Sequence, residues 1–167
     1  MKEKVLFFDI DGTLVDNTYG VYDVPEGVKR ELKRIQNDGH KLFICSGRPK
    51  AMINQQFLDL GFDGYVLYNG GYIEIDGESI FEERMDTELA TQTVDMLEEL
   101  NCDYMIETAH HIYIDKRYKE LYTFFKNLGM EEMFSMDFDR NDVLKRAIKI
   151  EANVTNKDKQ RVSDYLD

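Results

Sequence analysis

The sequence contains few cysteines and no long apolar run. Cys45 and Cys102 are its only two cysteines, and their spacing matches no metal-binding or redox motif. No apolar stretch approaches the length needed to cross a membrane, and the N-terminus has no secretory signal pattern. We therefore expect a cytoplasmic protein whose thiols are reduced.

Positive charge is also scarce. There are 21 Lys and Arg residues against 33 Asp and Glu residues, which gives a formal net charge of −12. Because such a surface repels phosphate backbones and anionic lipids, we expect neither nucleic acid nor a membrane as a partner. The rest of the composition, 43% hydrophobic and 32% charged, is typical of a globular protein. The 167 residues suffice for one good core, or for a modest domain and a small one.

The most informative stretch is an apolar run that ends in two carboxylates. The residues Val5–Phe8 predict a strand that is buried on both faces, as in a parallel sheet. Residues two apart in an extended chain point the same way, so Asp9 and Asp11 are expected to leave the strand together. Gly12 permits a tight turn, and Thr13 can hydrogen-bond to the backbone of the loop.

This stretch has two interpretations. A solvated Asp-Gly turn is enough to explain a bare Asp-x-Asp, because such turns are common. The complete Asp-x-Asp-Gly-Thr pattern after an apolar lead-in favours a ligand site instead. The carboxyl ends of parallel strands are where open α/β sheets bind ligands.

Strands and helices alternate in the first part of the chain. Pro25 is expected to open a helix that Gly39 ends, and residues 41–45 form a second apolar strand. A further helix is expected from Pro49 to Gly61, before a third strand at 65–67. This rhythm predicts a doubly wound α/β core with a parallel sheet and right-handed crossovers.

The pattern changes after residue 72. A hairpin turning at Asp76-Gly77 comes first, followed by a helix capped by Asp86 whose buried side includes Leu89. Short strands are expected near 104–107 and 112–114, then a helix with Phe124 on its apolar side that Gly129 closes. A one-sided, antiparallel strand over 146–152 and a last helix from Asn156 complete the pattern. These elements predict a second domain of α+β type, which divides the chain into 1–82 and 83–167.

The stretch from Asp9 to Thr13 resembles the first motif of the haloacid dehalogenase (HAD) superfamily, most of whose members are phosphatases. The resemblance implies that Asp9 is the nucleophile and forms an aspartyl-phosphate, while Asp11 protonates the leaving oxygen and then activates water. It also implies Mg²⁺ held by Asp9 and Asp11, because a carboxylate that attacks an anionic phosphoryl group needs a cation between them. Dehalogenases expel halide, which needs no proton, and lack the second Asp, so Asp11 favours phosphoryl transfer.

Two later stretches extend the resemblance. Ser46-Gly47-Arg48 resembles the second HAD motif, in which Ser46 would hydrogen-bond a phosphate oxygen and the helix after it would point its N-terminal N–H groups at the same anion. Arg48 either reaches the substrate or pairs with a nearby acid. Asn69-Gly70-Gly71 is similar to a step in Cof-type HAD phosphatases, although a plain turn before a hairpin explains it nearly as well. The implied phosphate-binding residues are Gly12, Thr13, Ser46, Gly47, Arg48 and Asn69.

The second domain looks like the cap that Cof-type members insert after the third strand, whose usual role is to close over the site. The Lys and the Gly-Asp motif that the superfamily carries after the cap are not found. The acidic stretch 137–142 is a tempting substitute, but a solvated loop explains it better. We therefore expect the N-terminal part of a longer protein, with its first strand short of a neighbour and prone to self-association.

These observations predict a Mg²⁺-dependent phosphatase acting on a small phosphorylated metabolite, for which a sugar phosphate is one candidate. The alternative is a non-catalytic fragment or phosphate-binding module without the Lys and the second acidic motif. A phosphomutase is a near relative that nothing in the sequence excludes. The sequence does not identify the substrate.

Overall fold

The apolar run Val5–Phe8 forms strand β1 in the computed structural model, which describes residues 2–127 and 130–166. It lies parallel to β2 (Lys41–Cys45), which in turn lies parallel to β3 (Gly64–Leu67). A hairpin of β4 (Tyr72–Ile75) and β5 (Glu78–Glu82) extends this sheet antiparallel to β3, so the strand order is β1-β2-β3-β4-β5. The predicted turn at Asp76-Gly77 has positive φ at both residues, 51° and 82°, as tight hairpin turns prefer.

Helix α1 (Glu26–Asn37) connects β1 to β2, and Pro25 precedes it as the N-cap. Gly39, with φ 82°, follows its end, as predicted. The single helix predicted from Pro49 to Gly61 is wrong. The segment forms a 3₁₀ turn (Lys50–Met52) and a short helix α2 (Gln55–Leu58), because Ile53 and Asn54 adopt extended backbone conformations. Both are weak helix formers.

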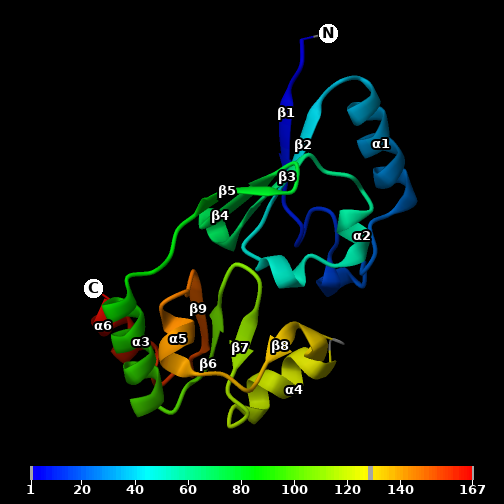
Figure 1. Cartoon of the computed structure of the whole chain (residues 1–167). Helices are drawn as coiled ribbons and strands as arrows, with labels where there is room; N and C mark the ends of the chain where they lie inside the picture. Colours follow the sequence, from blue (N-terminus) through cyan, green and yellow to red (C-terminus); the bar gives the residue numbers. More distant parts are fainter. Residues whose placement is uncertain (1, 128–129, 167) are drawn as a thin grey trace. The chain divides into compact units, whose positions relative to one another are not determined.

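The chain divides into two compact units, Met1–Glu83 and Arg84–Asp167. In the first unit, Leu42 and Ile44, two residues apart on β2, are fully buried on the same face of the sheet. Figure 1 labels the strands of this sheet, β1 to β5. The prediction that β1 is buried on both faces is wrong, because Val5 is 54% exposed and Phe7 is 60% exposed. Within the described residues β1 pairs only with β2, so it lies at the edge of the sheet, as expected.

The second unit has a four-stranded sheet of order β8-β7-β6-β9. Its strands are β6 (Asp103–Glu107), β7 (Ile112–Ile114), β8 (Phe134–Ser135) and β9 (Lys149–Asn153). Strand β6 is central and pairs antiparallel with both β7 and β9. The helices are α3 (Thr87–Glu99), α4 (Lys119–Asn127), α5 (Arg140–Leu144) and α6 (Lys159–Leu166). The molecule is therefore an α/β protein with a second, α+β unit, as predicted.

Some details of the second unit differ from the prediction. Asp86 caps α3 as expected, but Leu89 and Phe124 are exposed rather than buried. The last helix starts at Lys159 instead of Asn156, since residues 155–158 form a turn in which Thr155 donates a hydrogen bond to Asp158 (2.6 Å). The predicted helix end at Gly129 lies outside the described residues.

The described residues also form 3₁₀ turns at Asn17–Tyr19, Tyr68–Gly70 and Glu131–Met133. Among the helices that the structure describes, none has the length and apolar character required to cross a membrane.

Candidate active site

The loop after β1 presents its polar residues to solvent while its apolar residues anchor it. Ile10, Leu14 and Val15 are buried, whereas Asp9 and Asp11 are exposed. The backbone N–H groups of residues 13, 14 and 15 all point at the carbonyl oxygen of Ile10, at 3.0–3.3 Å, and this closes a tight turn. The sequence thus places two carboxylates at the carboxyl end of β1 on a loop that the core holds in place.

Each residue of this loop has a defined local partner. The Oδ1 atom of Asp9 accepts a hydrogen bond from the backbone N–H of Ile10 at 2.8 Å. Gly12 has φ 79° and donates its N–H to the carbonyl of Val15 at 2.7 Å. That positive φ is the conformation for which glycine is suited. Thr13 is exposed beside it.

The loop after β2 is also ordered by hydrogen bonds. Ser46 is buried, and its backbone N–H donates to the carbonyl of Val66 on β3 at 2.9 Å. Its Oγ accepts a hydrogen bond from the backbone N–H of Arg48 at 3.2 Å. Because the oxygen is occupied as an acceptor there, the hydroxyl proton remains to be donated to another group.

Arg48 joins the two loops. Its Nε lies 2.8 Å from Oδ2 of Asp11, and its Nη2 lies 2.6 Å from Oδ1 of the same carboxylate. This is the bidentate arrangement in which guanidinium and carboxylate groups bind most strongly. Of the two roles left open for Arg48, the structure shows the pair with a nearby acid.

Asn69 belongs to the same cluster of loops. Tyr68 and Asn69 both have positive φ, 54° and 58°, which is uncommon for residues other than glycine. The backbone N–H of Tyr68 donates to the carbonyl of Arg48 (3.2 Å), and that of Asn69 donates to the carbonyl of Ser46 (3.4 Å). A Cβ added to Gly47 would stand 3.0 Å from Oδ1 of Asn69, so the two loops approach closely there.

The structure therefore brings Asp11, Ser46, Gly47, Arg48 and Asn69 together, and it places Asp9, Gly12 and Thr13 on the loop that carries Asp11. The predicted helix N-terminus after Pro49 is a 3₁₀ turn instead, and the backbone N–H of Lys50 donates to the hydroxyl of Tyr68 at 3.0 Å.

The donor set suits magnesium in kind. Asp9 and Asp11 supply carboxylate oxygens, and Mg²⁺ in proteins is commonly held by one or two carboxylates together with waters and substrate phosphate. Across residues 2–127 and 130–166, no group of three or more His, Cys, Asp or Glu side chains is arranged to hold a metal ion. The acidic stretch 137–142 does not form such a group. Asp139 caps α5 by accepting a hydrogen bond from the N–H of Asp142 at 2.9 Å.

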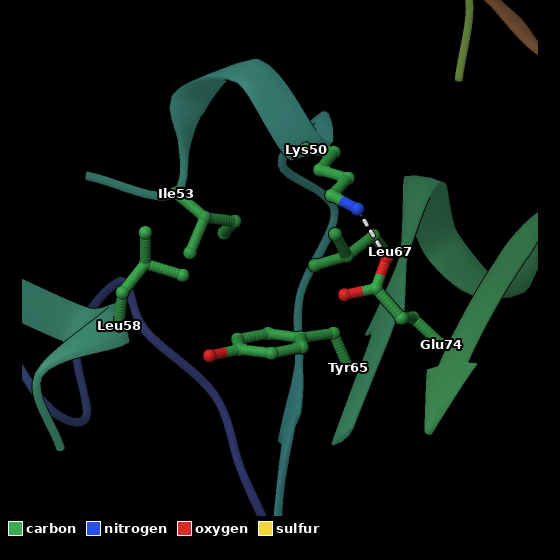
Figure 2. A pocket seen from close by; sticks show the side chains of 6 residues that line it. All are labelled: Lys50, Ile53, Leu58, Tyr65, Leu67 and Glu74. Carbon is green, nitrogen blue, oxygen red and sulfur yellow. Dashed lines mark hydrogen bonds and ion pairs between the residues drawn. The ribbon is translucent and has the colours of Figure 1, made fainter. Parts of the chain in front are cut away.

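A cavity beside these loops was not predicted from the sequence. It is lined by Lys50, Ile53, Leu58, Tyr65, Leu67 and Glu74 (Figure 2). Lys50 and Glu74 form an ion pair across it, and the Tyr72 hydroxyl donates to Glu74 at 2.9 Å. Burial opposes the charge of Lys50, but the Glu74 carboxylate outweighs this and raises the pKa of Lys50. A carboxylate in the middle of an alternating strand, at Glu74, was the signal that could have revealed the pair.

Comparison with known proteins gives a consistent result for the whole chain. The model of a family described as haloacid dehalogenase-like hydrolase matches residues 6–167. YkrA of Bacillus subtilis is 32% identical over 82 residues, which is 49% of this chain and 31% of YkrA. Phosphatase YwpJ, also of Bacillus subtilis, is 27% identical over 120 residues, which is 71% of this chain and 41% of YwpJ. The chain spans less than half the length of these relatives.

Solved structures support the fold. A sugar phosphatase of HAD subclass IIB, BT4131, superimposes with a TM-score of 0.78 at 23% identity, over 98% of this chain and 63% of that protein. A protein of Geobacillus kaustophilus superimposes with a TM-score of 0.81 at 19% identity, over 99% of this chain and 63% of that one. At these identities the likeness establishes the shared fold.

Proposed function

Because the chain belongs to the haloacid dehalogenase-like hydrolase family, we propose that it carries the nucleophile and the proton-transferring acid of a Mg²⁺-dependent phosphatase. The observation that carries the proposal is the position of Asp9 and Asp11. Both are exposed at the carboxyl end of β1, and Arg48 ties Asp11 to the loop after β2. This edge of an α/β sheet is where such folds bind their ligands.

The chemistry proposed for each side chain is the one that the resemblance to the HAD family implies. Asp9 attacks the phosphorus and forms an aspartyl-phosphate, which divides one difficult displacement into two steps. Asp11 gives its proton to the leaving oxygen and then takes a proton from the water that hydrolyses the intermediate. Bound at Asp9 and Asp11, Mg²⁺ would reduce the repulsion between the attacking carboxylate and the anionic substrate.

The remaining predicted residues bind the phosphate. Ser46 accepts a hydrogen bond from Arg48, so its hydroxyl proton can be donated to a phosphate oxygen. Gly12, Thr13 and Gly47 would line the cradle, where the exposed hydroxyl of Thr13 is a further donor, and Asn69 would close it from the loop after β3. Such groups supply local positive potential in a chain whose net charge is −12.

For the substrate, we propose only a chemical class. A small phosphorylated metabolite fits the family, and BT4131, which shares the fold, is named a sugar phosphatase. Sugar phosphates are therefore the first substrates to test. We assign the second unit, Arg84–Asp167, as the cap that would shape this choice. The protein is proposed to work in the cytoplasm.

A second candidate is a chain that binds phosphate without turnover. The observation behind it is the metal site: in the part of the chain that the structure describes, Asp9 and Asp11 have no third acidic partner arranged with them. This candidate shares the phosphate cradle with the first and differs from it only in catalysis.

Phosphate release separates the two candidates. The wild-type chain is incubated with 4-nitrophenyl phosphate and with a panel of hexose and pentose phosphates, with Mg²⁺ and with a chelator, beside Asp9→Asn. Asp23→Asn, which changes an exposed acid of the same unit, is the matched control. The proposal predicts Mg²⁺-dependent release that falls by about 10³-fold or more in Asp9→Asn and is unchanged in the control. Release that persists in Asp9→Asn would contradict it, and binding of inorganic phosphate without release would favour the second candidate.

A further inference from the structure

The guanidinium of Arg48 is held on several sides. Two of its nitrogens contact the two carboxylate oxygens of Asp11, at 2.8 and 2.6 Å. The third, Nη1, donates to the backbone carbonyl of Met52 at 3.4 Å. The ring of Phe57 lies below the group, with its centroid 5.7 Å from Cζ. The side chain is only 19% exposed, so Arg48 is fixed from within the unit rather than extended into solvent.

The carboxylate of Asp11 has the opposite character. Its side chain is 54% exposed on a loop outside the strand. The backbone of Asp11 forms an isolated β-bridge with Val15, which fixes the main chain but not the carboxylate. Among the described residues, every hydrogen bond to its two oxygens comes from Arg48. The orientation of this carboxylate therefore depends on one partner.

We propose that Arg48 is a positioning residue, which orients the carboxylate of Asp11 for proton transfer and does not serve primarily as a ligand of the substrate phosphate. The proposal rests on the proposed function. Three of the five guanidinium N–H groups are engaged by protein groups, and these include the Nε–H and Nη2–H pair that forms bidentate contacts, so a phosphate could take up that bidentate arrangement only by displacing Asp11. Carboxylates that are pre-oriented in this way transfer protons without first having to be ordered.

The two roles predict different dependence on the leaving group. A sugar hydroxyl is a poor leaving group and needs a proton from Asp11, whereas 4-nitrophenolate departs readily without one. Loss of a positioning residue for the acid should therefore slow hydrolysis of a hexose phosphate much more than that of 4-nitrophenyl phosphate. Loss of a phosphate ligand should affect both substrates alike, because both carry the same phosphoryl group.

The experiment compares the full chain with Arg48→Met and Arg48→Lys on these two substrates with Mg²⁺ present. Arg34→Met is the matched control, since Arg34 pairs with the carboxylates of Glu31 and Asp38 at the exposed surface of α1. In Arg48→Met we expect kcat for the hexose phosphate to fall by about 10²-fold, with a loss at least about tenfold smaller for the aryl phosphate. Arg48→Lys keeps the charge but not the bidentate geometry, and we expect it to restore little of the kcat that Arg48→Met loses on the hexose phosphate. Equal losses on both substrates, with raised KM, would overturn the proposal.

A second readout does not need turnover. In ¹⁵N NMR spectra of the wild-type chain, the Nε–H of Arg48 should be protected from exchange with water, and this protection should be lost in Asp11→Asn. A signal that is unchanged in Asp11→Asn would overturn the positioning role. A wild-type chain that releases phosphate from neither substrate would overturn the proposed function and this role together, and the Nε–H signal would then show whether the pair itself exists.

Discussion

The two units of the chain place their important charged groups in opposite environments. In the first unit, Asp9 and Asp11 are exposed at a strand end, and Asp11 is bound by a guanidinium. In the second unit, Glu107 of the central strand β6 is fully buried. Neither of its carboxylate oxygens has a hydrogen-bond partner among the described residues, and its nearest cation is Nζ of Lys149 at 3.5 Å. The carboxylates of the first unit are therefore accessible for chemistry, whereas a charge on the buried Glu107 would destabilise the second unit.

The difference is visible in the titration of Glu107. Burial is the main cause that raises the pKa of this carboxyl from 4.5 to about 7, and the nearby Glu151 carboxylate adds to it, while Lys149 opposes it. Lys149 also pairs with Glu151 at 3.0 Å, so two carboxylates share one ammonium group. A raised pKa means that the folded second unit prefers Glu107 in the neutral form.

The largest expected effect is therefore the pH dependence of the second unit. Since the pKa is raised on folding, the contribution of Glu107 is complete below pH 4.5 and is lost as the pH rises through about 7. The loss amounts to about 3 kcal/mol in the free energy of unfolding. Glu107→Gln should remove this dependence and leave the variant more stable than wild type at pH 8. Urea unfolding followed through the methyl NMR signals of Ile106 and Ile114 would measure it.

Glu151→Gln is the control for that measurement. It changes the exposed carboxylate that contacts the same lysine, and we expect its stability to stay within about 0.5 kcal/mol of wild type. The buried-charge account of the second unit would be wrong if wild type and Glu107→Gln lost stability equally between pH 5 and pH 8.

The next effect concerns packing in the first unit. A Cβ built on Gly64 of β3 would stand 2.4 Å from the carbonyl oxygen of Glu74 and 2.6 Å from the Phe43 ring. We expect Gly64→Ala to destabilise this unit by about 1–3 kcal/mol, because backbone and side chains must move apart. Gly27→Ala, within α1, would meet only Arg30 at 3.9 Å and should stabilise by a few tenths of a kcal/mol up to about 1. Thermal unfolding of the two variants measures this: the melting temperature should fall in Gly64→Ala and rise slightly in Gly27→Ala. A shift in the same direction in both variants would contradict the prediction.

The smallest effect on stability is expected at the open face of β1. Val5 and Phe7 are exposed there, and the Phe7 ring lies 5.4 Å from that of Phe43. Phe7→Thr keeps strand propensity, so the free energy of unfolding should change by less than about 0.5 kcal/mol. Self-association of the chain, measured by sedimentation over a range of concentrations, should decrease. Tyr19→Ser, at an exposed loop position, should leave it unchanged. A wild-type chain that sediments as a monomer throughout would count against the expected self-association.

Much of the fold follows from local patterns in the sequence. The three apolar runs of the first unit were predicted within one residue of their observed bounds, because strand periodicity and turn residues are local signals. The alternating strand predicted over 146–152 also forms, but β9 begins three residues later, at Lys149. The single helix expected after Pro49 does not form, because the 3₁₀ turn Lys50–Met52 and the short helix α2 already bury Met52, Ile53 and Phe57. The exposure of Phe7 depends on which strands lie beside β1, and no local pattern contains that information.

The members of the candidate site stay a prediction from the sequence, and the sequence did not indicate their contacts. Asp9 and Ser46 were identifiable because each directly follows an apolar strand, and Asp11 because it lies two residues after Asp9. The Arg48–Asp11 pair was one of two open alternatives, since it joins residues 37 positions apart and depends on the spacing of β1 and β2. The Lys50–Glu74 pair and the buried Glu107 were missed, because a charged residue inside a strand pattern is normally placed on the solvent face.

The central claim, that Asp9 is a nucleophile that becomes phosphorylated, can be tested directly by trapping the intermediate. Asp11→Asn removes the group that would activate water, so this variant should accumulate the aspartyl-phosphate when it is mixed with 4-nitrophenyl phosphate and Mg²⁺ and quenched in acid. Peptide mass spectrometry is then expected to find one added phosphoryl group on the peptide that contains Asp9, and none when Asp9→Asn is combined with Asp11→Asn. Phosphate found on another residue, or turnover of the wild-type chain without any trapped phosphopeptide in the variant, would contradict the account.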